Sequence, residues 1–494
     1  MMSRNNNIFS DNKVVFGYIG VLTMIIGIII LLPLIVIIVY PNESKYAADF
    51  IIPSFIAILV GFILSRFIKL NERQNLSVAQ DTIIVVFVWI LASFFSAMPF
   101  ILSGQLNFTQ AYFEAVSGWT TTGLSVVNVE AAPKIYLMHR SIMQFFGGIG
   151  LVLVMVSALS ATFGMKLYSS EGHSDRLLPN LLRSSRMIMS IYIGYIIAGT
   201  ILYYIFGMPL FDGINHSIAA LSTGGFGIKT DSIGAYKSFS IELITIILMI
   251  LGTTNFAAHL LLVKRNFRKF LKVDEVRFMF LVFGISIPLV AFFSLKNIYG
   301  SVSESFRISA FQVVSALSTT GFSTVSFNNW DSFSIFIMII LMVIGGGAGS
   351  TAGGIKLYRV YLMIKTFFWN LKKKFMPEHM VNEDFVFKPE GKVYIQESHI
   401  LDATNYAFIY IVILFIGTGI IVANGYSLQD ALFEFASSLG TVGLSVGITS
   451  PTTSAIVLWT EIIGMLFGRL EIYVIFIAII KVFKDIRVVI NRKF

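Results

Sequence analysis

The sequence predicts an all-α membrane protein of four span–pore-helix–span repeats in a pseudo-fourfold arrangement, plus two extra N-terminal helices. Two observations predict the class. The 494-residue chain has a mean hydropathy of +0.81, and 13% charged residues are too few to cover a soluble protein of this size. A glycine-containing motif also recurs four times between apolar runs, which predicts the repeats.

Apolar runs long enough to cross a bilayer occur ten times along the chain, since a spanning helix needs about 20 residues. The first run is too long for a signal-peptide core, so it is interpreted as a span. The expected spans cover residues 14–40, 47–69, 83–103, 138–163, 186–207, 240–263, 275–296, 333–368, 400–423 and 453–483.

The distribution of basic residues predicts the orientation. With both termini inside, inner segments carry 28 Lys and Arg residues and outer segments carry 7, while Arg469 lies within a span. This bias predicts a multi-pass protein of a cell membrane with both termini cytoplasmic. Basic loops facing the anionic inner leaflet explain the formal net charge of +9, so we expect membrane lipid and no nucleic acid as a partner.

Four outer loops share the pattern Thr-x-Gly-(Leu/Phe)-(Ser/Gly). They cover residues 121–125, 223–227, 319–323 and 441–445, and their central glycines lie 102, 96 and 122 residues apart. Each loop follows a helix-like stretch of about a dozen residues, which is too short to span the bilayer. The pattern therefore predicts an internal repeat, with an N-terminal two-helix unit at 1–75, pore repeats at 76–170 and 171–270, a third repeat with a broken helix and a cytoplasmic linker at 271–398, and a fourth at 399–494.

The chemistry of these loops favours a cation filter. Glycine permits positive φ, so successive carbonyl oxygens can face one axis and replace the water around a dehydrated ion. The carboxyl end of each short helix would add partial negative charge there. No ring of Asp or Glu lies in the motif, which argues against a filter for divalent ions. The alternative is that Gly and Thr only allow close helix packing.

With one glycine in each of four loops, nearly the whole chain resembles the TrkH/KtrB/HKT family of potassium transporters. The two extra spans are more similar to TrkH, the membrane subunit of the Trk potassium uptake system, than to KtrB. The resemblance implies potassium as the substrate and no cofactor in this chain. Gly227 and Val442 differ from residues common in the family, Ser and Thr respectively. The implied potassium-binding residues are Thr121, Thr122, Gly123, Thr223, Gly224, Gly225, Thr319, Thr320, Gly321, Thr441, Val442 and Gly443.

A long apolar segment in the third repeat should break. Residues 331–368 would form a continuous helix of about 57 Å, against a hydrocarbon core of about 30 Å. The break is expected at a run containing Gly345, Gly346, Gly347, Gly349, Gly353 and Gly354. It is not a phosphate-binding loop, because Leu357 follows Lys356 where Ser or Thr is required. A passive kink remains the alternative to a gate, which is what the family resemblance implies.

Arg469 is the second gate candidate. It lies 16 residues after Thr453 and 12 before Lys481, so it is far from both ends of the expected span. A buried arginine in a membrane is costly and usually has a function. It can oppose cations in the pore or donate hydrogen bonds to carbonyls freed by the glycine run. The alternative is an ion pair with Glu461 or Glu471.

Regulation should come from another protein, because the longest inner loop, at about 370–398, is too short to fold alone. The resemblance implies a homodimer and a cytoplasmic nucleotide-binding ring of the TrkA/KtrA type. The alternative function is an ion-coupled secondary transporter that moves potassium with a proton or sodium, although such proteins usually have inverted repeats. Sodium conduction also stays open. The spans lack a nucleophile–base pair, so an enzyme is not expected.

Overall fold

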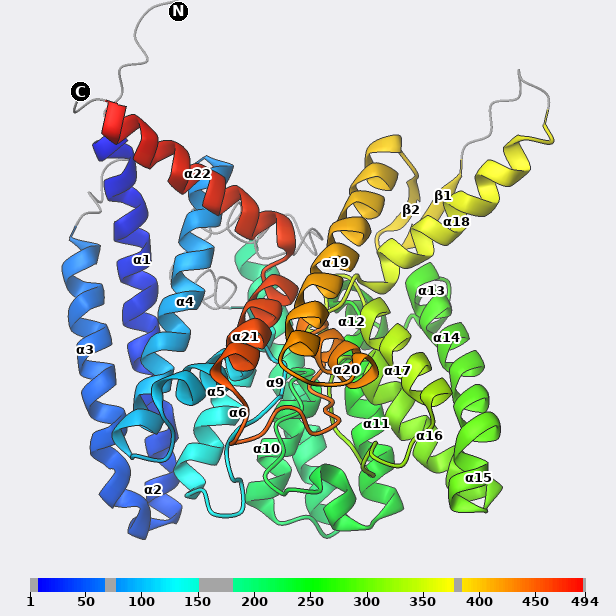
Figure 1. Ribbon diagram of the computed structural model, residues 1–494, viewed down its shortest axis with the longest axis horizontal. Helices are drawn as coiled ribbons and strands as arrows, with labels where there is room; N and C mark the ends of the chain where they lie inside the picture. The colour runs from blue at the N-terminus through cyan, green and yellow to red at the C-terminus, as the bar shows by residue number, and fades with distance from the viewer. Residues whose placement is uncertain (1–7, 67–76, 151–180, 377–383, 492–494) are drawn as a thin grey trace, which may run out of the picture. The chain divides into compact units, whose positions relative to one another are not determined.

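The computed structural model describes residues 8–66, 77–150, 181–376 and 384–491, and nearly all of them are helical (Figure 1). The chain forms two compact units. The first contains Met1–Trp119, Ala131–Met187 and Leu470–Phe494, and the second contains Thr120–Glu130 and Ile188–Arg469.

The first unit contains two spanning helices at its start, followed by α4, a short helix and α6. In Figure 1, α1, α3 and α4 run side by side, and α22 packs on α4. Its elements are α1 (Ile8–Leu31), η1 (Leu32–Ile35), α2 (Val36–Val39), η2 (Pro41–Tyr46), α3 (Ala47–Ser65), α4 (Val78–Leu102), α5 (Phe108–Trp119), α6 (Lys134–Ile149) and α22 (Ile472–Asn491).

The second unit contains three further short helices, each between longer ones. The first of the longer helices, α9, begins at Leu181, a few residues before the longer segment of the unit starts at Ile188. Its elements are α9 (Leu181–Ile205), α10 (Leu210–Leu221), η3 (Ser232–Tyr236), α11 (Phe239–Thr253), α12 (Phe256–Val263), α13 (Phe267–Phe270), α14 (Asp274–Val290), η4 (Ala291–Leu295), α15 (Lys296–Tyr299), α16 (Val302–Leu317), α17 (Ser332–Ile344), α18 (Leu357–Lys373), β1 (Phe385–Lys388), β2 (Gly391–Tyr394), α19 (Glu397–Ala423), α20 (Leu428–Leu439) and α21 (Ala455–Arg469).

Among the described residues, six helices are long and apolar enough to cross a membrane, or up to eight if each of two broken pairs is one span. The six are Lys13–Val39, Pro41–Ser65, Ala79–Leu102, Ser185–Ile205, Asp274–Tyr299 and Glu397–Ala423. Of the ten expected spans, 138–163 is described only as far as α6 and Gly150, and its remainder lies outside the described residues. The segment 333–368 breaks after Ile344, where the sequence predicts a break, and α18 resumes the helix at Leu357.

Two spans that we expected to be continuous are broken, and those predictions are wrong. In 240–263, α11 and α12 meet at an angle of 115°. The side chain of Asn255 accepts a hydrogen bond from Ala257 N at 2.6 Å and so caps a new helix in the middle of the run. In 453–483, α21 ends at Arg469, and Glu471 has a φ of 59°, which a continuing helix excludes.

The prediction of an all-α fold is wrong at one place. Strands β1 and β2 form an antiparallel hairpin in which Lys388 pairs with Gly391. Val386 is buried with Leu362 of α18 and Ala403 of α19, so the hairpin is supported by helices. A two-stranded hairpin needs such support because it is marginal alone.

Helices α1 and α3 pack closely through small residues. A Cβ added at Gly61 would lie closer than 3.0 Å to backbone atoms of Gly20 and Met24. Ser54 Oγ donates to Gly27 O at 2.7 Å across the same interface. Small residues allow membrane helices to make such backbone contacts.

We predict that Gly61→Ala lowers the thermal stability of the purified protein in detergent, because the added methyl must push the two backbones apart. Overpacking of this kind costs about 1–3 kcal/mol. Gly284→Ala on α14 is the control, since no atom lies within 4 Å of its added Cβ. Equal melting temperatures for the two variants would contradict close α1–α3 packing.

Candidate functional site

The four Thr-x-Gly loops share one backbone conformation. Each begins where a short helix ends, at α5, α10, α16 or α20. The first threonine of each motif has a φ between 50° and 55°, and the central glycine has a φ between 65° and 93°. Positive φ is unusual for a β-branched residue. Four equivalent departures indicate a shared constraint at a functional site. The threonines are Thr121, Thr223, Thr319 and Thr441, and the glycines are Gly123, Gly225, Gly321 and Gly443.

In three of the loops, a backbone amide donates a hydrogen bond to a carbonyl oxygen of the short helix that precedes the loop. The bonds are Gly224 N to Ala219 O at 2.8 Å, Thr320 N to Ser315 O at 3.0 Å and Val442 N to Ser437 O at 2.8 Å. In a trans peptide the carbonyl points away from the N–H that shares its plane. The carbonyl oxygens of Thr223, Thr319 and Thr441 therefore point away from their helices.

The loops close into a ring in which each central glycine faces a carbonyl oxygen of the next loop. A Cβ added at Gly123 would collide with Gly224 O of the second loop. The relation repeats around the ring, since Gly225 faces Thr320 O, Gly321 faces Val442 O and Gly443 faces Thr122 O. All four contacts lie within the second unit. Only glycine fits these positions, because both the φ and the space exclude a side chain.

The glycine-rich segment 345–356, which we call the 345–356 loop, contacts the threonines that begin the motifs. Gly353 N donates to Thr319 Oγ1 at 2.8 Å, and Thr223 Oγ1 donates to Thr351 Oγ1 at 3.0 Å. An added Cβ at Gly353 would collide with the Thr441 side chain. The loop therefore lies directly against the ring, on its threonine side.

Arg469, the last residue of α21, contacts both the 345–356 loop and the ring. Its Nη1 donates to Thr351 O at 2.6 Å and lies 3.3 Å from Thr121 Oγ1. The guanidinium thus interacts with a freed carbonyl of the loop, as one of our interpretations of the sequence expects. Glu461, the alternative partner within this unit, accepts a hydrogen bond from Thr449 Oγ1 at 3.1 Å.

The break between α11 and α12 supports the other side of the 345–356 loop. Five hydrogen bonds join them: Thr351 Oγ1 to Gly252 O at 2.9 Å, Thr351 N to Gly252 O at 3.4 Å, Gly347 N to Thr253 O at 3.0 Å, Phe256 N to Gly349 O at 3.0 Å, and Asn255 Nδ2 to Ala348 O at 2.6 Å. Backbone groups released by one broken helix are thus satisfied by the other, as an environment without water requires.

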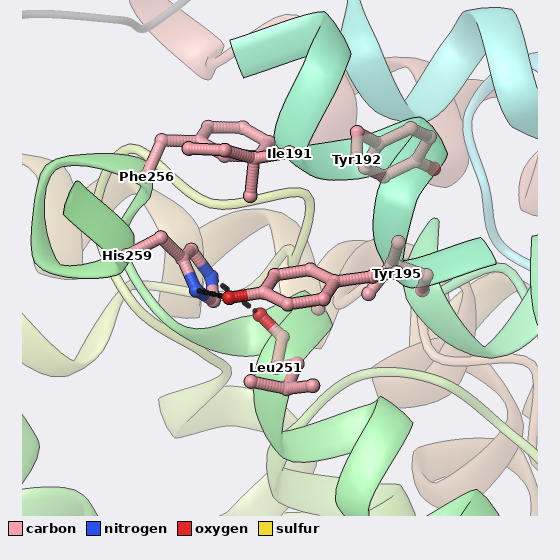
Figure 2. Close-up of a pocket in the computed structure, with 8 residues that line it drawn as sticks. Ile191, Tyr192, Tyr195, Leu251, Phe256 and His259 are labelled. Atoms are coloured by element: carbon pink, nitrogen blue, oxygen red, sulfur yellow. Dashed lines mark hydrogen bonds between the residues drawn. The ribbon is translucent and has the colours of Figure 1, made fainter. Parts of the chain in front are cut away.

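Residues on both sides of this break line a small, mostly apolar pocket (Figure 2). It is lined by Ile191, Tyr192, Tyr195, Leu221, Leu251, Gly252, Phe256 and His259. His259 Nε2 bonds to Leu251 O at 2.9 Å and must donate to that carbonyl, so Nδ1 accepts from the Tyr195 hydroxyl at 3.3 Å. The hydrogen bond from His259 of α12 to Leu251 O therefore joins α12 to the end of α11 and stabilises the bend between them.

Sequence reasoning missed several residues that hold this site. Glu434 of α20 accepts bonds from Ser445 Oγ at 2.7 Å and from Val446 N at 3.0 Å, which fixes the chain just after the fourth loop. Glu275 of α14 accepts from Ala348 N at 2.6 Å in the 345–356 loop. Both carboxylates are buried. Glu434 is the one charged residue in the stretch ALFEFASSL, and that rarity was the available signal, whereas Glu275 lies in the charged stretch KVDEVR and gave no such signal. No cluster of His, Cys, Asp or Glu suited to a metal ion occurs within the described residues.

A family model described as TrkH, a cation transport protein, matches residues 49–486 of the chain. The chain belongs to the TrkH family of cation transport proteins. It is therefore a multi-pass membrane transporter and not an enzyme. TrkH-family relatives align over nearly their full lengths, and so does a solved structure.

An uncharacterized cation transporter of Methanocaldococcus jannaschii is 32% identical over 94% of both chains. The Trk system potassium uptake protein TrkG of Escherichia coli K12 is 31% identical, over 95% of this chain and 98% of its own length. The crystal structure of the potassium transporter TrkH from Vibrio parahaemolyticus has 26% identity and a TM-score of 0.82, and the match covers 95% of this chain and 98% of that one.

We predict that His259→Phe lowers the melting temperature in detergent, because Phe keeps a similar shape but cannot donate to Leu251 O. Loss of such a bond costs about 1–3 kcal/mol. Tyr195→Phe should have a smaller effect, since its bond is longer. Tyr204→Phe, at an exposed tyrosine of the same helix, is the control. If His259→Phe melted like the control, His259 would not fix the bend.

Proposed function

We propose that this chain takes up potassium across the cell membrane through a single-chain pore whose selectivity filter is the ring of four Thr-x-Gly loops. The observation that carries the proposal is the closed contact from each glycine to a carbonyl oxygen of the next loop. The names of the relatives, which include Trk system potassium uptake proteins, support potassium as the ion.

In this proposal the filter is built from backbone oxygens. A potassium ion loses its water on entering, and the carbonyls of Thr122, Gly224, Thr320 and Val442 replace it. The carbonyls of the four preceding threonines form a second layer. We further propose that the repeats, with the boundaries given above, are related by pseudo-fourfold symmetry around this ring. The similar φ values at the matching threonine and glycine of each motif support that symmetry.

The 345–356 loop and Arg469 form the proposed gate. The loop bonds to Thr223 and Thr319, so it occupies the threonine side of the ring. Arg469 holds Thr351 and places a positive charge beside the same path. A cation leaving the ring would meet both obstacles, so the described conformation corresponds to a closed gate. Its glycines, Gly345, Gly346, Gly347, Gly349, Gly353 and Gly354, allow the loop to change conformation.

The proposed setting is the inner membrane of a prokaryotic cell, with both termini cytoplasmic. A membrane potential that is negative inside would then drive uptake, at about 2.3 kcal/mol per charge per 100 mV. The word "system" in the names of the relatives implies additional subunits. We propose a homodimer regulated by a cytoplasmic nucleotide-binding ring docked on the basic inner loops.

The direct test is uptake of rubidium-86 into lipid vesicles that contain only the purified protein, with potassium or sodium as competitor. We expect uptake that follows an imposed membrane potential and is blocked more strongly by potassium. Uptake that requires a sodium or proton gradient would favour the alternative, an ion-coupled secondary transporter. Absence of rubidium uptake by well-folded protein, with or without these gradients, would reject both.

We predict that Gly123→Ala lowers the preference for potassium over sodium about tenfold or more, because the added methyl collides with Gly224 O in the ring. Gly447→Ala is a matched control. Gly447 also has a positive φ, of 97° against 93° for Gly123, but nothing lies within 4 Å of its added Cβ. Backbone strain is therefore similar in both variants. A tenfold loss of preference corresponds to about 1.4 kcal/mol in the free-energy difference between the two ions. Equal ion preferences in the two variants would count against the filter assignment.

We predict that Arg469→Ala raises basal rubidium uptake, because it removes both the positive charge and the bond to Thr351. Arg469→Lys separates these contributions, since lysine keeps the charge but not the planar hydrogen-bonding fork. Low uptake in the lysine variant assigns the barrier to charge, and high uptake assigns it to the bond. Uptake by the alanine variant at or below that of the parent protein, at equal protein levels, would remove Arg469 from the gate.

A further inference from the structure

Two adjacent carboxylates begin α14, and they hold different parts of the second unit. Glu275 Oε1 accepts from Ala348 N at 2.6 Å, in the middle of the 345–356 loop. Asp274 Oδ2 accepts from Phe387 N at 2.9 Å, in strand β1 of the hairpin. Both carboxylates are almost completely buried. One helix start therefore contacts the proposed gate and the hairpin at once.

The carboxylate is well placed to hold the loop. A charged acceptor makes a stronger hydrogen bond to a backbone amide than a neutral one does. Negative charge is also favourable in the first turn of a helix, where the dipole is positive. The position of Glu275 on α14 is thus stabilised independently of the loop, and α14 gives the loop a rigid attachment point.

The hairpin in turn is attached to the helix that follows the gate. Lys365 of α18 forms an ion pair with Asp384 at 3.0 Å, just before β1. Tyr361 of the same helix lies beside Asp274 and packs on Phe278 of α14, with ring centres 5.7 Å apart. Displacing the hairpin would therefore disturb Asp274, α18 and the start of α14 together.

We propose that Glu275 is the positioning residue that keeps the 345–356 loop against the ring, and that Asp274 makes this attachment depend on the hairpin. The inference rests on the proposed function, in which this loop is the gate. Movement of the hairpin away from α14 would shift the first turn of α14, withdraw the acceptor from Ala348 N and release the loop. Through α14, the hairpin would then transmit a change at the inner face of the membrane to the proposed gate.

The chain has no cysteine, so one introduced cysteine can report the position of the loop without background. Ala352→Cys places it at a residue that is 1% exposed in the described conformation. In this background Glu275→Ala should raise the rate of modification by a charged thiol reagent about tenfold, because a hydrogen bond to a charged group is lost. Glu275→Gln should give a smaller rise, since its amide oxygen still accepts. Glu397→Ala, at an exposed glutamate in the first turn of α19, is the control.

The same variants are then measured for rubidium-86 uptake, where Glu275→Ala should raise the basal flux and leave the preference for potassium unchanged. Modification and flux at the level of the Glu397→Ala control would overturn the role of Glu275, while selective uptake by the parent protein would leave the proposed function intact. Protein that carries no rubidium would instead reject the proposed function, and the cysteine rates would still report on the attachment.

The dependence on the hairpin is tested with Asp274→Ala and the double variant. If Asp274 acts through Glu275, Asp274→Ala alone raises the modification rate, and the double variant is no faster than Glu275→Ala. Independent attachments would instead give a double variant whose increase is the product of the two single increases, and this would contradict the proposed coupling. No change in Asp274→Ala would also contradict it.

Discussion

Backbone amides and carbonyls that leave a helix at membrane depth find no partners in hydrocarbon, so the protein must supply all of them. In three of the ring loops the amides donate to the preceding short helix, which turns the carbonyls of Thr223, Thr319 and Thr441 away from those helices. In all four loops, the carbonyl before the central glycine faces the glycine of a neighbouring loop. The 345–356 loop and the α11–α12 break exchange hydrogen bonds in both directions. The arrangement of the site follows from this requirement, because neither broken segment has enough partners of its own.

One consequence is that the proposed filter and the proposed gate are not separate modules. The hydroxyls of Thr223 and Thr319 belong to the Thr-x-Gly motifs, and they also bond to the 345–356 loop. Arg469 bridges the same two features from α21. A change in the position of the 345–356 loop must therefore replace hydrogen-bond partners of these two threonines. In the proposed function, opening the gate and adjusting the inner end of the filter are then a single structural event.

The sequence predicted the features that local chemistry specifies. Four Thr-x-Gly motifs behind short helices predicted the four loops, and clustered glycines predicted the break after Ile344. The α11–α12 bend was missed because residues 240–263 form one long, mostly apolar run, and the hydrogen-bond partners of the bend lie about a hundred residues away in the 345–356 loop. Glu275 was missed for the same reason, since Ala348 is 73 residues away. The hairpin was overlooked because its FVFK strand is short, shows no apolar–polar alternation and lies in a charged linker.

The central claim is that a cation without its water occupies the ring of carbonyl oxygens. The most direct measurement is a structure of the protein determined in rubidium, with the ion located by its anomalous scattering. A peak on the axis of the ring, surrounded by the oxygens of Thr122, Gly224, Thr320 and Val442, is the predicted result. Four loops that lie apart, or an ordered ring without rubidium while the ion binds elsewhere in the chain, would contradict it.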